Sequence, residues 1–327
     1  MHRLKPHKIG HYQSVAKAIR KSRRIAICAH MFPDGDALGS MTGLAQILRR
    51  LNKKVVMFSP SPLPKRYRFL PEYLRIRRHE SGSGPFDLAI AVDCASYVQL
   101  GEFYEKIFRK TAVTIEIDHH TFRKPFAGLT LVDDKAAAVG EMIYYLSRLL
   151  RVSIDQETAV SLLVSIIVET GSFRLPTISA ETFEICAELL SKGVDYYGLV
   201  EKSYWSRSRQ EATLLGLCFS RIRFLSGGKL ADTYVTLGDL KRLGASDEDV
   251  DPIADQIRTL KEVKVVLMSR EMAGGRWRIS LRSKGRVNVG EIAEEFGGGG
   301  HPDVAGCFIG GSTAEKKALI KRIQKEF

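Results

Sequence analysis

The sequence predicts an α/β protein, with a doubly wound, mostly parallel sheet in a first domain and a smaller α/β domain behind a helical linker. Three observations predict this architecture. Short apolar runs alternate with helical patterns, several of these runs end in an acidic residue, and the 327 residues are enough for two domains. We place the first domain at residues 1–195, the linker at 196–223 and the second domain at 224–327.

The elements of the first domain are predicted from its apolar patterns. Four apolar runs predict strands at 24–29, 54–59, 86–92 and 112–117. Apolar residues at helical spacing predict helices at 11–21, 37–51, 138–150, 155–168 and 180–190. The basic, proline-rich stretch between residues 60 and 78 is predicted to be an irregular connection.

The second half continues the alternation on a smaller scale. Residues 196–223 have a helical but less hydrophobic pattern, which is why we assign them to the linker. Strands are predicted at 230–237, 263–270 and 276–282, with helices between them and a further helix at 289–296. A run of four glycines follows at 297–300.

Composition limits the class of protein. Hydrophobic residues make up 44% of the chain, no stretch is long and apolar enough to span a membrane, and no apolar segment follows the basic N-terminus. These features predict a cytoplasmic protein without a membrane partner. The five cysteines are odd in number and show no CxxC spacing, so neither a disulfide framework nor a cysteine zinc site is expected. The net charge of +13 favours anionic partners, whether nucleic acid, phosphorylated small molecules or acidic surfaces.

Carboxylates and imidazoles stand at the end of an apolar element in four places. They are His30, Asp34 and Asp36; Asp93; Asp118, His119 and His120; and Glu169. Because ligands bind outside the carboxyl ends of strands in open α/β sheets, the first three groups are expected to converge. Crowded carboxylates repel one another, and divalent cations resolve that conflict. Mixed imidazole and carboxylate ligands suit manganese, iron or zinc better than magnesium alone.

A helix cap is the alternative explanation for any one of these acidic residues. Caps do not explain four such places that hold three of the eight histidines. The turn with Pro33 and Gly35 can present alternate side chains to two neighbouring metals. Two metals about 3.5–4 Å apart are the usual clamp for attack on phosphorus.

The motifs resemble those of the DHH phosphoesterase superfamily and, most closely, its subgroup of nanoRNases and pAp phosphatases (NrnA-like). Asp118-His119-His120 is similar to the motif that gives the superfamily its name. Two further segments carry the resemblance. The segment His30–Ser40 is similar to the first motif of the superfamily. The segment Phe296–His301, with Ala305-Gly306, is similar to the associated C-terminal domain.

The resemblance implies a centre with two Mn²⁺ ions. One ion would be held by His30 and Asp34, the other by Asp36, His119 and Glu169, with Asp93 bridging the two. Asp118 would orient a histidine ligand, as metal-bound histidines generally require. His120 would face the substrate phosphate, and a bridging hydroxide would attack phosphorus. Glu169 stands where the family usually has Asp, so we expect a shifted carboxylate with altered metal preference rather than loss of activity.

The second domain is expected to bind the substrate. Glycines adopt positive φ and expose N–H groups to phosphate, so the resemblance implies a phosphate and base pocket. Its residues would be Arg282, Ser283, Gly298, Gly299, Gly300 and His301. A flexible glycine turn is the alternative. Aromatic residues in the 66–78 segment are expected to pack in a connecting loop, with base stacking as the alternative.

The function implied is Mn²⁺-dependent hydrolysis of short RNA or DNA oligonucleotides of about 2–5 nucleotides, of pAp to AMP, or of both. The alternatives are a phosphodiesterase of cyclic dinucleotides or of linear pApA and pGpG, and a catalytically silent nucleotide-binding regulator. A duplex-DNA-binding protein would also explain the charge. The resemblance further implies a homodimer.

Overall fold

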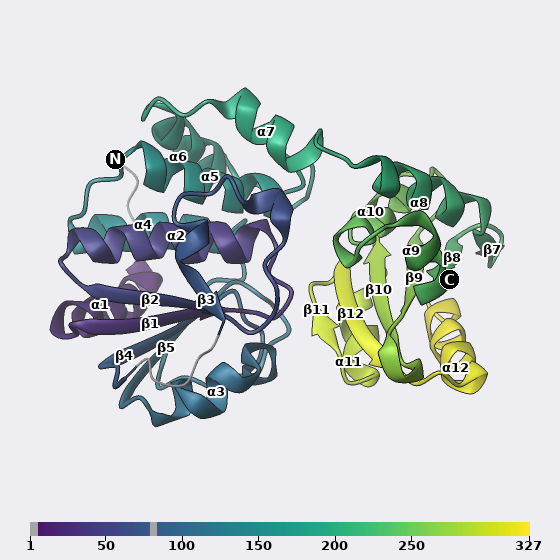
Figure 1. Ribbon diagram of the computed structural model, residues 1–327, viewed down its shortest axis with the longest axis horizontal. Helices are drawn as coiled ribbons and strands as arrows, with labels where there is room; N and C mark the ends of the chain where they lie inside the picture. Colours follow the sequence, from purple (N-terminus) through teal and green to yellow (C-terminus); the bar gives the residue numbers. More distant parts are fainter. Residues whose placement is uncertain (1–5, 79–83) are drawn as a thin grey trace. The chain divides into compact units, whose positions relative to one another are not determined.

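A computed structural model describes residues 6–78 and 84–327 of the chain (Figure 1). The chain divides into two compact units, described here one at a time. The first contains residues 1–120 and 124–206, and the second contains residues 121–123 and 207–327. The break after residue 206 falls inside the stretch that the sequence assigns to the linker.

The first unit is built on a parallel sheet of six strands with the order β3-β2-β1-β4-β5-β6. Its strands are β1 (Arg24–Ala29), β2 (Lys54–Ser59), β3 (Ile76–Arg78), β4 (Leu88–Val92), β5 (Val113–Asp118) and β6 (Leu129–Val132). The order reverses between β1 and β4, as in doubly wound folds that bind ligands at this switch point. The predicted fold class is confirmed.

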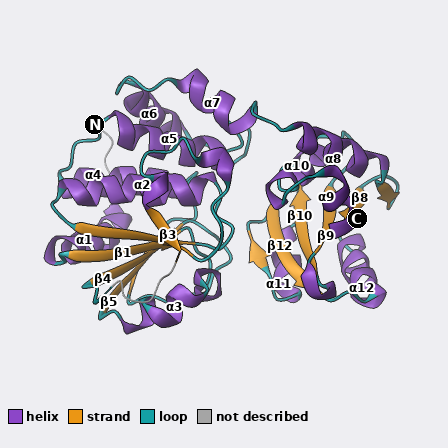
Figure 2. Ribbon diagram, viewed as in Figure 1, coloured by secondary structure: helices purple, strands orange, loops and turns teal. Residues whose placement is uncertain are grey.

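Helices cover the two faces of this sheet unequally (Figure 2). The α-helices are α1 (Pro6–Lys21), α2 (Gly35–Arg50), α3 (Glu102–Lys106), α4 (Val139–Leu150), α5 (Gln156–Glu169), α6 (Ala180–Leu190) and α7 (Tyr196–Tyr204). The 3₁₀ turns are η1 (Lys65–Tyr67), η2 (Tyr73–Arg75), η3 (Tyr97–Leu100) and η4 (Phe108–Lys110). On β1, Ile25 and Ile27 face the core shared with α1, α2 and α4, while Ala26 and Cys28 face α3 and η4. This alternation is the two-residue period of a strand buried on both faces.

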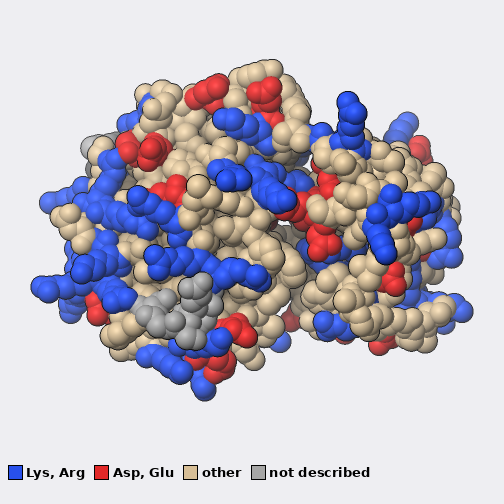
Figure 3. Space-filling model, viewed as in Figure 1, with Lys and Arg blue, Asp and Glu red and all other residues tan. Residues whose placement is uncertain are grey.

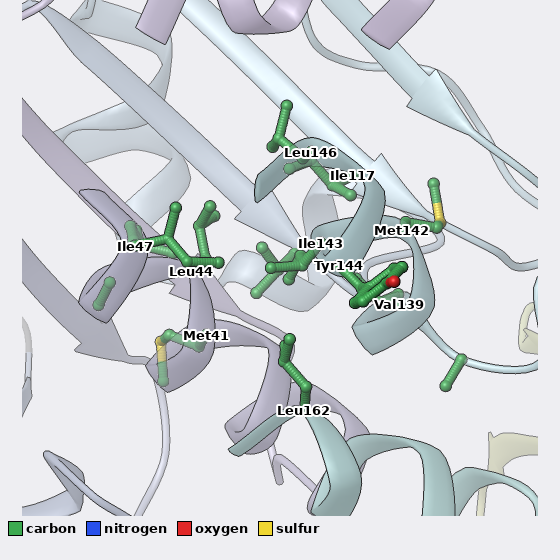
Figure 4. Close-up of a cluster of buried hydrophobic side chains, with 14 of the residues drawn as sticks. Met41, Leu44, Ile47, Ile117, Val139, Met142, Ile143, Tyr144, Leu146 and Leu162 are labelled. Atoms are coloured by element: carbon green, nitrogen blue, oxygen red, sulfur yellow. The ribbon is translucent and has the colours of Figure 1, made fainter. Parts of the chain in front are cut away.

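The larger core lies between the sheet and the long helices (Figure 4). Met41 and Leu44 of α2 and Ile143 of α4 are fully buried there, together with Ile117 of β5. Leu162 of α5 joins the same core, with α5 packing on α2 and α4. The helix that carries Glu169 is therefore fixed by apolar packing, which positions its last residue.

Small residues allow α2, α4 and α5 to approach closely. A Cβ atom on Gly39 would lie 2.4 Å from the carbonyl oxygen of Ser161, and one on Gly140 would lie 2.3 Å from Ser165 Oγ. Real Cβ atoms do not come this near to other atoms, so both positions require glycine. The close approach places the Ser165 hydroxyl between the three helices.

The second unit contains a mixed sheet with the order β11-β12-β10-β9-β8-β7. Its strands are β7 (Arg223–Leu225), β8 (Leu230–Val235), β9 (Val265–Glu271), β10 (Trp277–Ser283), β11 (Gly299–Gly300) and β12 (Val304–Ile309). Only β8 and β9 pair in parallel among the described strands of this sheet. The predicted smaller α/β domain therefore has a largely antiparallel sheet.

Helices lie on both faces of the second sheet. The helices and turns are α8 (Arg209–Ser220), α9 (Leu237–Leu243), η5 (Asp247–Asp249), α10 (Ile253–Arg258), η6 (Ala273–Gly275), α11 (Val289–Glu295) and α12 (Thr313–Gln324). Apolar residues of α11 and α12 form one core with the sheet, and those of α8, α9 and α10 form the other. Leu214 and Cys218 of α8 are fully buried, so this part of the predicted linker belongs to a core.

The connection after β2 packs against the larger core of the first unit. Tyr67 and Tyr73 are only 6% and 7% exposed, which supports loop packing rather than base stacking for these aromatic residues.

All five cysteines are buried and free. Among the described residues, no helix is long and apolar enough to cross a membrane. Lys and Arg side chains are spread widely over the face of the first unit that Figure 3 shows.

We predict that Gly39→Ala destabilises the protein, because the added methyl group must push α5 away from α2. Overpacking of this kind costs about 1–3 kcal/mol. Gly216→Ala is the matched control, since a Cβ there meets nothing within 4 Å and α8 is exposed at that point. It should stabilise by up to about 1 kcal/mol through helix propensity. Thermal and urea unfolding of both variants checks the contrast, and equal effects would contradict the packing argument.

Candidate metal centre

The register of the parallel sheet brings the ends of three strands level. Ala29 pairs with Val92, and Val92 pairs with Ile117. The residues that follow each strand position are His30, Asp93 and Asp118. They therefore lie side by side at the carboxyl edge, where the strand order reverses. The convergence expected from the sequence is what the structure shows for these three residues.

Helix α2 adds two carboxylates at its N-terminus. Asp34 is the N-cap, and its Oδ1 accepts a hydrogen bond from Ala37 N at 3.0 Å. The same oxygen lies 3.9 Å from His30 Nε2, so Asp34 both caps the helix and faces the cluster. Asp36 is fully buried, and its Oδ2 lies 3.4 Å from His119 Nε2.

Asp93 belongs to three groups of metal-ligand type, and two of them consist of residues expected to bind metal. His30, Asp34 and Asp93 form one, and Asp36, Asp93 and His119 form the other, with donor atoms within 4.8 Å of one another in each group. Asp93 Oδ2 lies 3.6 Å from His30 Nε2, and Asp93 Oδ1 lies 3.7 Å from His119 Nε2. One carboxylate thus presents an oxygen to each side.

Glu169 reaches the second of these groups from the end of α5. Its Oε1 lies 3.7 Å from His119 Nε2. The longer side chain, in place of the Asp that resembling proteins carry, therefore still delivers its carboxylate to His119. Thr170 caps the helix directly afterwards, and the chain then turns through positive φ at Gly171.

Backbone carbonyls orient the two ligand-type histidines. His30 Nδ1 lies 2.9 Å from Met31 O, and His119 Nδ1 lies 3.1 Å from Ala136 O. A carbonyl only accepts, so each Nδ1 carries the proton when the ring is neutral and each Nε2 keeps its lone pair. Both Nε2 atoms face the carboxylates, which is the orientation that a metal-binding histidine needs.

The surroundings of Asp93 and Asp36 also fit a cation. Asp93 Oδ1 is buried and accepts no hydrogen bond from the described residues. Burial, with the neighbouring charges of Asp93 and Asp34, raises the pKa of Asp36 well above its usual value. Carboxylates crowded in this way are stabilised by divalent cations, and the mixed oxygen and nitrogen donors suit manganese, iron or zinc. The residues present therefore fit the metals that the sequence predicts.

Imidazoles carry the compensating charge around Asp93. Burial opposes ionisation of Asp93, but its contacts with His30, His120 and His119 outweigh that effect and lower its pKa. Burial likewise opposes protonation of His30, yet Asp93 and Asp34 raise its pKa to about 9. Burial lowers the pKa of His119, which keeps its ring neutral.

Asp118 pairs with the second histidine of its motif. His120 Nδ1 donates to Asp118 Oδ1 at 2.7 Å, and it lies 3.7 Å from Asp93 Oδ1. The sequence assigns Asp118 to a histidine that binds metal. The structure shows it hydrogen-bonded to His120, the residue expected to face the substrate. Burial opposes protonation of His120, but Asp118 raises the pKa of His120 to about 9.

Two serines that the sequence leaves without a role hold Asp36. Ser40 and Ser165 donate to Asp36 Oδ1 at 2.8 and 2.6 Å, and Val139 N donates to Oδ2 at 3.0 Å. Ser40 follows Asp36 by four residues on α2, and Ser165 precedes Glu169 by four on α5. That spacing places Ser40 on the same helix face as Asp36, and Ser165 on the same helix face as Glu169. The spacing is the signal that could have identified both serines.

Left-handed backbone conformations occur at the candidate site. Phe32 and Asp93 both have φ of 57°, and Ser172 and Phe173, just after α5, have φ of 61° and 60°. For a residue other than glycine, a sparsely populated backbone conformation costs about 1–3 kcal/mol. Such conformations persist where the surrounding structure fixes them. Asp tolerates this region better than a bulky aromatic residue does.

The glycine run of the second unit packs against β12. A Cβ on Gly298 would lie 2.0 Å from Gly306 O, and one on Gly300 would lie 2.4 Å from Val304 O. Gly299 differs, because a Cβ there meets nothing within 4 Å. His301 N donates to Val304 O at 2.6 Å, which closes the turn before β12.

Arg282 and Ser283, predicted to bind substrate, end strand β10. Arg282 Nε donates to Asp255 Oδ1 at 3.1 Å. Ser283 is buried, and its hydroxyl lies 2.7 Å from Val287 O and 3.2 Å from Pro302 O. The serine hydroxyl therefore ties together the two loops that flank α11.

Two family models match the chain. The N-terminal domain of the DHH family matches residues 24–166, and the DHHA1 domain matches residues 229–327. An exopolyphosphatase-related protein from Bacteroides fragilis has the same fold, with a TM-score of 0.87, 23% identity and coverage of 97% of this chain and 96% of that one.

Curated relatives match most of this chain. The cyclic-di-AMP phosphodiesterase GdpP of Bacillus subtilis is 24% identical over 99% of this chain, which spans 50% of that protein. The bifunctional oligoribonuclease and PAP phosphatase NrnA of Thermus thermophilus is 31% identical over 92% of this chain and 90% of its own length. With this identity and coverage, the chain belongs to the DHH family, in the group that contains the NrnA proteins.

Proposed function

We propose that this chain is a phosphoesterase that hydrolyses short oligonucleotides and pAp with the help of two divalent cations. The observation that carries the proposal is the pair of ligand groups that share Asp93. The names of the NrnA relatives, oligoribonuclease and PAP phosphatase, support the substrate class. The excess of positive charge favours such anionic substrates.

We propose that the two cations are Mn²⁺ and that each is held by one of the ligand groups. His30, Asp34 and Asp93 would hold one, and Asp36, Asp93, His119 and Glu169 would hold the other. Bound at these positions, the cations would lower the pKa of a water molecule and neutralise charge that develops on phosphorus. Ser40 and Ser165 keep Asp36 in position by their hydrogen bonds, as outer partners of metal ligands generally do.

His120 and Asp118 act on the substrate rather than on the cations in this proposal. Asp118 accepts a hydrogen bond from His120 Nδ1, which fixes the ring and stabilises its charged form. Asp118 raises the pKa of His120 against the effect of burial, which favours the protonated ring. The charged ring attracts the substrate phosphate, and its Nε2 proton is available to a leaving oxygen.

In the second unit we propose that Arg282, Gly298, Gly299, Gly300 and His301 bind a nucleotide. The guanidinium of Arg282 is held by Asp255, which orients it for phosphate. For Ser283 we propose support of the binding loops through its bonds to Val287 and Pro302. A homodimer stays a prediction, which light scattering of the purified protein tests.

The second candidate function is hydrolysis of a cyclic dinucleotide or its linear product. The similarity to GdpP, named a cyclic-di-AMP phosphodiesterase, favours it. This chain spans only half of that protein, so the activity of the longer protein does not transfer as a whole. A catalytically silent regulator is less well supported, because the predicted metal ligands His30, Asp93 and His119 face one another.

We predict that Asp93→Asn abolishes hydrolysis, because the shared carboxylate loses the charge that both cations need. The loss should exceed the roughly 100-fold that removal of outer partners of metal ligands produces. Asn tolerates the left-handed backbone at this position, so the fold should survive. Steady-state kinetics with circular dichroism checks both points. Asp134→Asn, at an exposed acid, is the control, and normal turnover by Asp93→Asn would contradict the shared role.

We predict that Mn²⁺ raises the thermal unfolding temperature and that a chelator reverses the gain. A ligand at about 100 times its Kd stabilises the state it binds by about 2.7 kcal/mol. Asp36→Asn should remove most of the gain, because it takes one carboxylate from the buried group. Differential scanning calorimetry checks this without any substrate. A gain that is the same in Asp36→Asn would place the cations elsewhere.

We predict that substrate length separates the candidate functions. With Mn²⁺, an RNA dinucleotide and pAp should be hydrolysed rapidly and a long RNA much more slowly. A side-by-side assay should also include a cyclic dinucleotide and pyrophosphate, each with and without chelator. Preference for the cyclic dinucleotide would favour the second candidate. Binding of nucleotides without turnover would favour the silent regulator.

A further inference from the structure

Phe32 stands out in the loop that joins β1 to α2. It lies between His30 and Asp34, both assigned above to one cation. Its φ is 57°, a region that bulky residues rarely adopt. The residue is 40% exposed, so part of it is open to solvent.

Two hydrogen bonds from neighbouring segments fix this backbone. Phe32 N donates to Ser61 Oγ at 2.6 Å, and Met31 N donates to Gln99 O at 2.8 Å. Ser61 is itself buried, 6% exposed, and follows β2. The loop is therefore held from β2 on one side and from η3 on the other, in a conformation that keeps an aromatic ring partly in solvent.

The backbone of Phe32 lies within one nucleotide of the cluster. Consecutive Cα atoms are about 3.8 Å apart, so the Cα of Phe32 lies within roughly 8 Å of the Cα atoms of His30 and Asp34. A nucleobase is joined to its phosphate through a single sugar. The base of a nucleotide whose phosphate is held at the metal centre is therefore within reach of this loop. Aromatic side chains bind bases of any sequence by stacking on their faces.

We infer that Phe32 stacks against the nucleobase next to the phosphate that is hydrolysed. The inference rests on the proposed function and adds a base-binding position in the first unit, beside the cations. Stacking tolerates every base, so Phe32 sets a requirement for a nucleobase without selecting among bases. The strained backbone holds the ring in place before substrate arrives, which reduces the entropy lost on binding.

The alternative is that the ring only stabilises the loop. The two explanations differ for Phe32→Asn, because Asn adopts the left-handed region readily. If the ring only packs, this variant lowers the unfolding temperature and leaves substrate preference alone. If the ring stacks on substrate, the unfolding temperature stays or rises and the preference changes.

The test compares pAp with an abasic analogue that keeps the sugar and both phosphates but has no base. Wild type, Phe32→Asn and Phe32→Tyr are measured with Mn²⁺ by steady-state kinetics. The wild type should prefer pAp by at least about fivefold in kcat/KM. Phe32→Asn should lose most of this preference, mainly through KM, and Phe32→Tyr should keep it. Tyr197→Ala removes another exposed aromatic ring, 61% exposed on α7, and should keep it too.

Binding separates failure of this inference from failure of the proposed function. Isothermal titration of pAp and the abasic analogue needs no turnover. If wild type binds pAp more tightly and Phe32→Asn removes the difference, the inference stands even when neither compound is hydrolysed. If Phe32→Asn keeps the full preference for pAp in both assays, the inference is overturned while the phosphoesterase function is untouched.

Discussion

The carboxylate of Asp93 lies 3.6–3.7 Å from nitrogen atoms of His30, His119 and His120. A carboxylate buried this deeply is stable only beside positive charge, whether protonated imidazoles or cations. The neighbouring groups follow from that requirement. His119 is oriented by a backbone carbonyl, and Asp36, which lies near it, is fixed by hydroxyls. The local structure is therefore arranged around one negative charge at the edge of the sheet.

The framework that meets this requirement comes from two kinds of packing. Strand register places His30, Asp93 and Asp118 side by side, because each follows a set of paired residues. Helix packing positions the groups on α5, because glycines on α2 and α4 let α5 approach closely enough for Ser165 to bond to Asp36. Apolar packing that is remote from the chemistry thus controls the distance between ligands. A displaced α5 would move Ser165 and Glu169 together.

The sequence predicts what depends on local pattern. The runs at 24–29, 54–59 and 180–190 match β1, β2 and α6 to the residue, and the predicted helix at 155–168 differs from α5 by one residue at each end. The sequence does not predict five strands, β3, β6, β7, β11 and β12. All five lie at a sheet edge or next to one, where pairing depends on tertiary neighbours. The hydrogen bond from Ser165 to Asp36 joins α5 to α2, 129 residues apart in the chain, so it depends on tertiary packing.

The glycines of the run differ in the space that surrounds them. Gly298 and Gly300 are required because β12 leaves no room for a Cβ, which is a packing constraint independent of any ligand. Gly299 has open space where its side chain would be, so packing does not explain it. A nucleotide that approaches the backbone closely would explain it. The ligand-binding interpretation of this run therefore depends on Gly299, and the glycines beside it fix the strand that presents it.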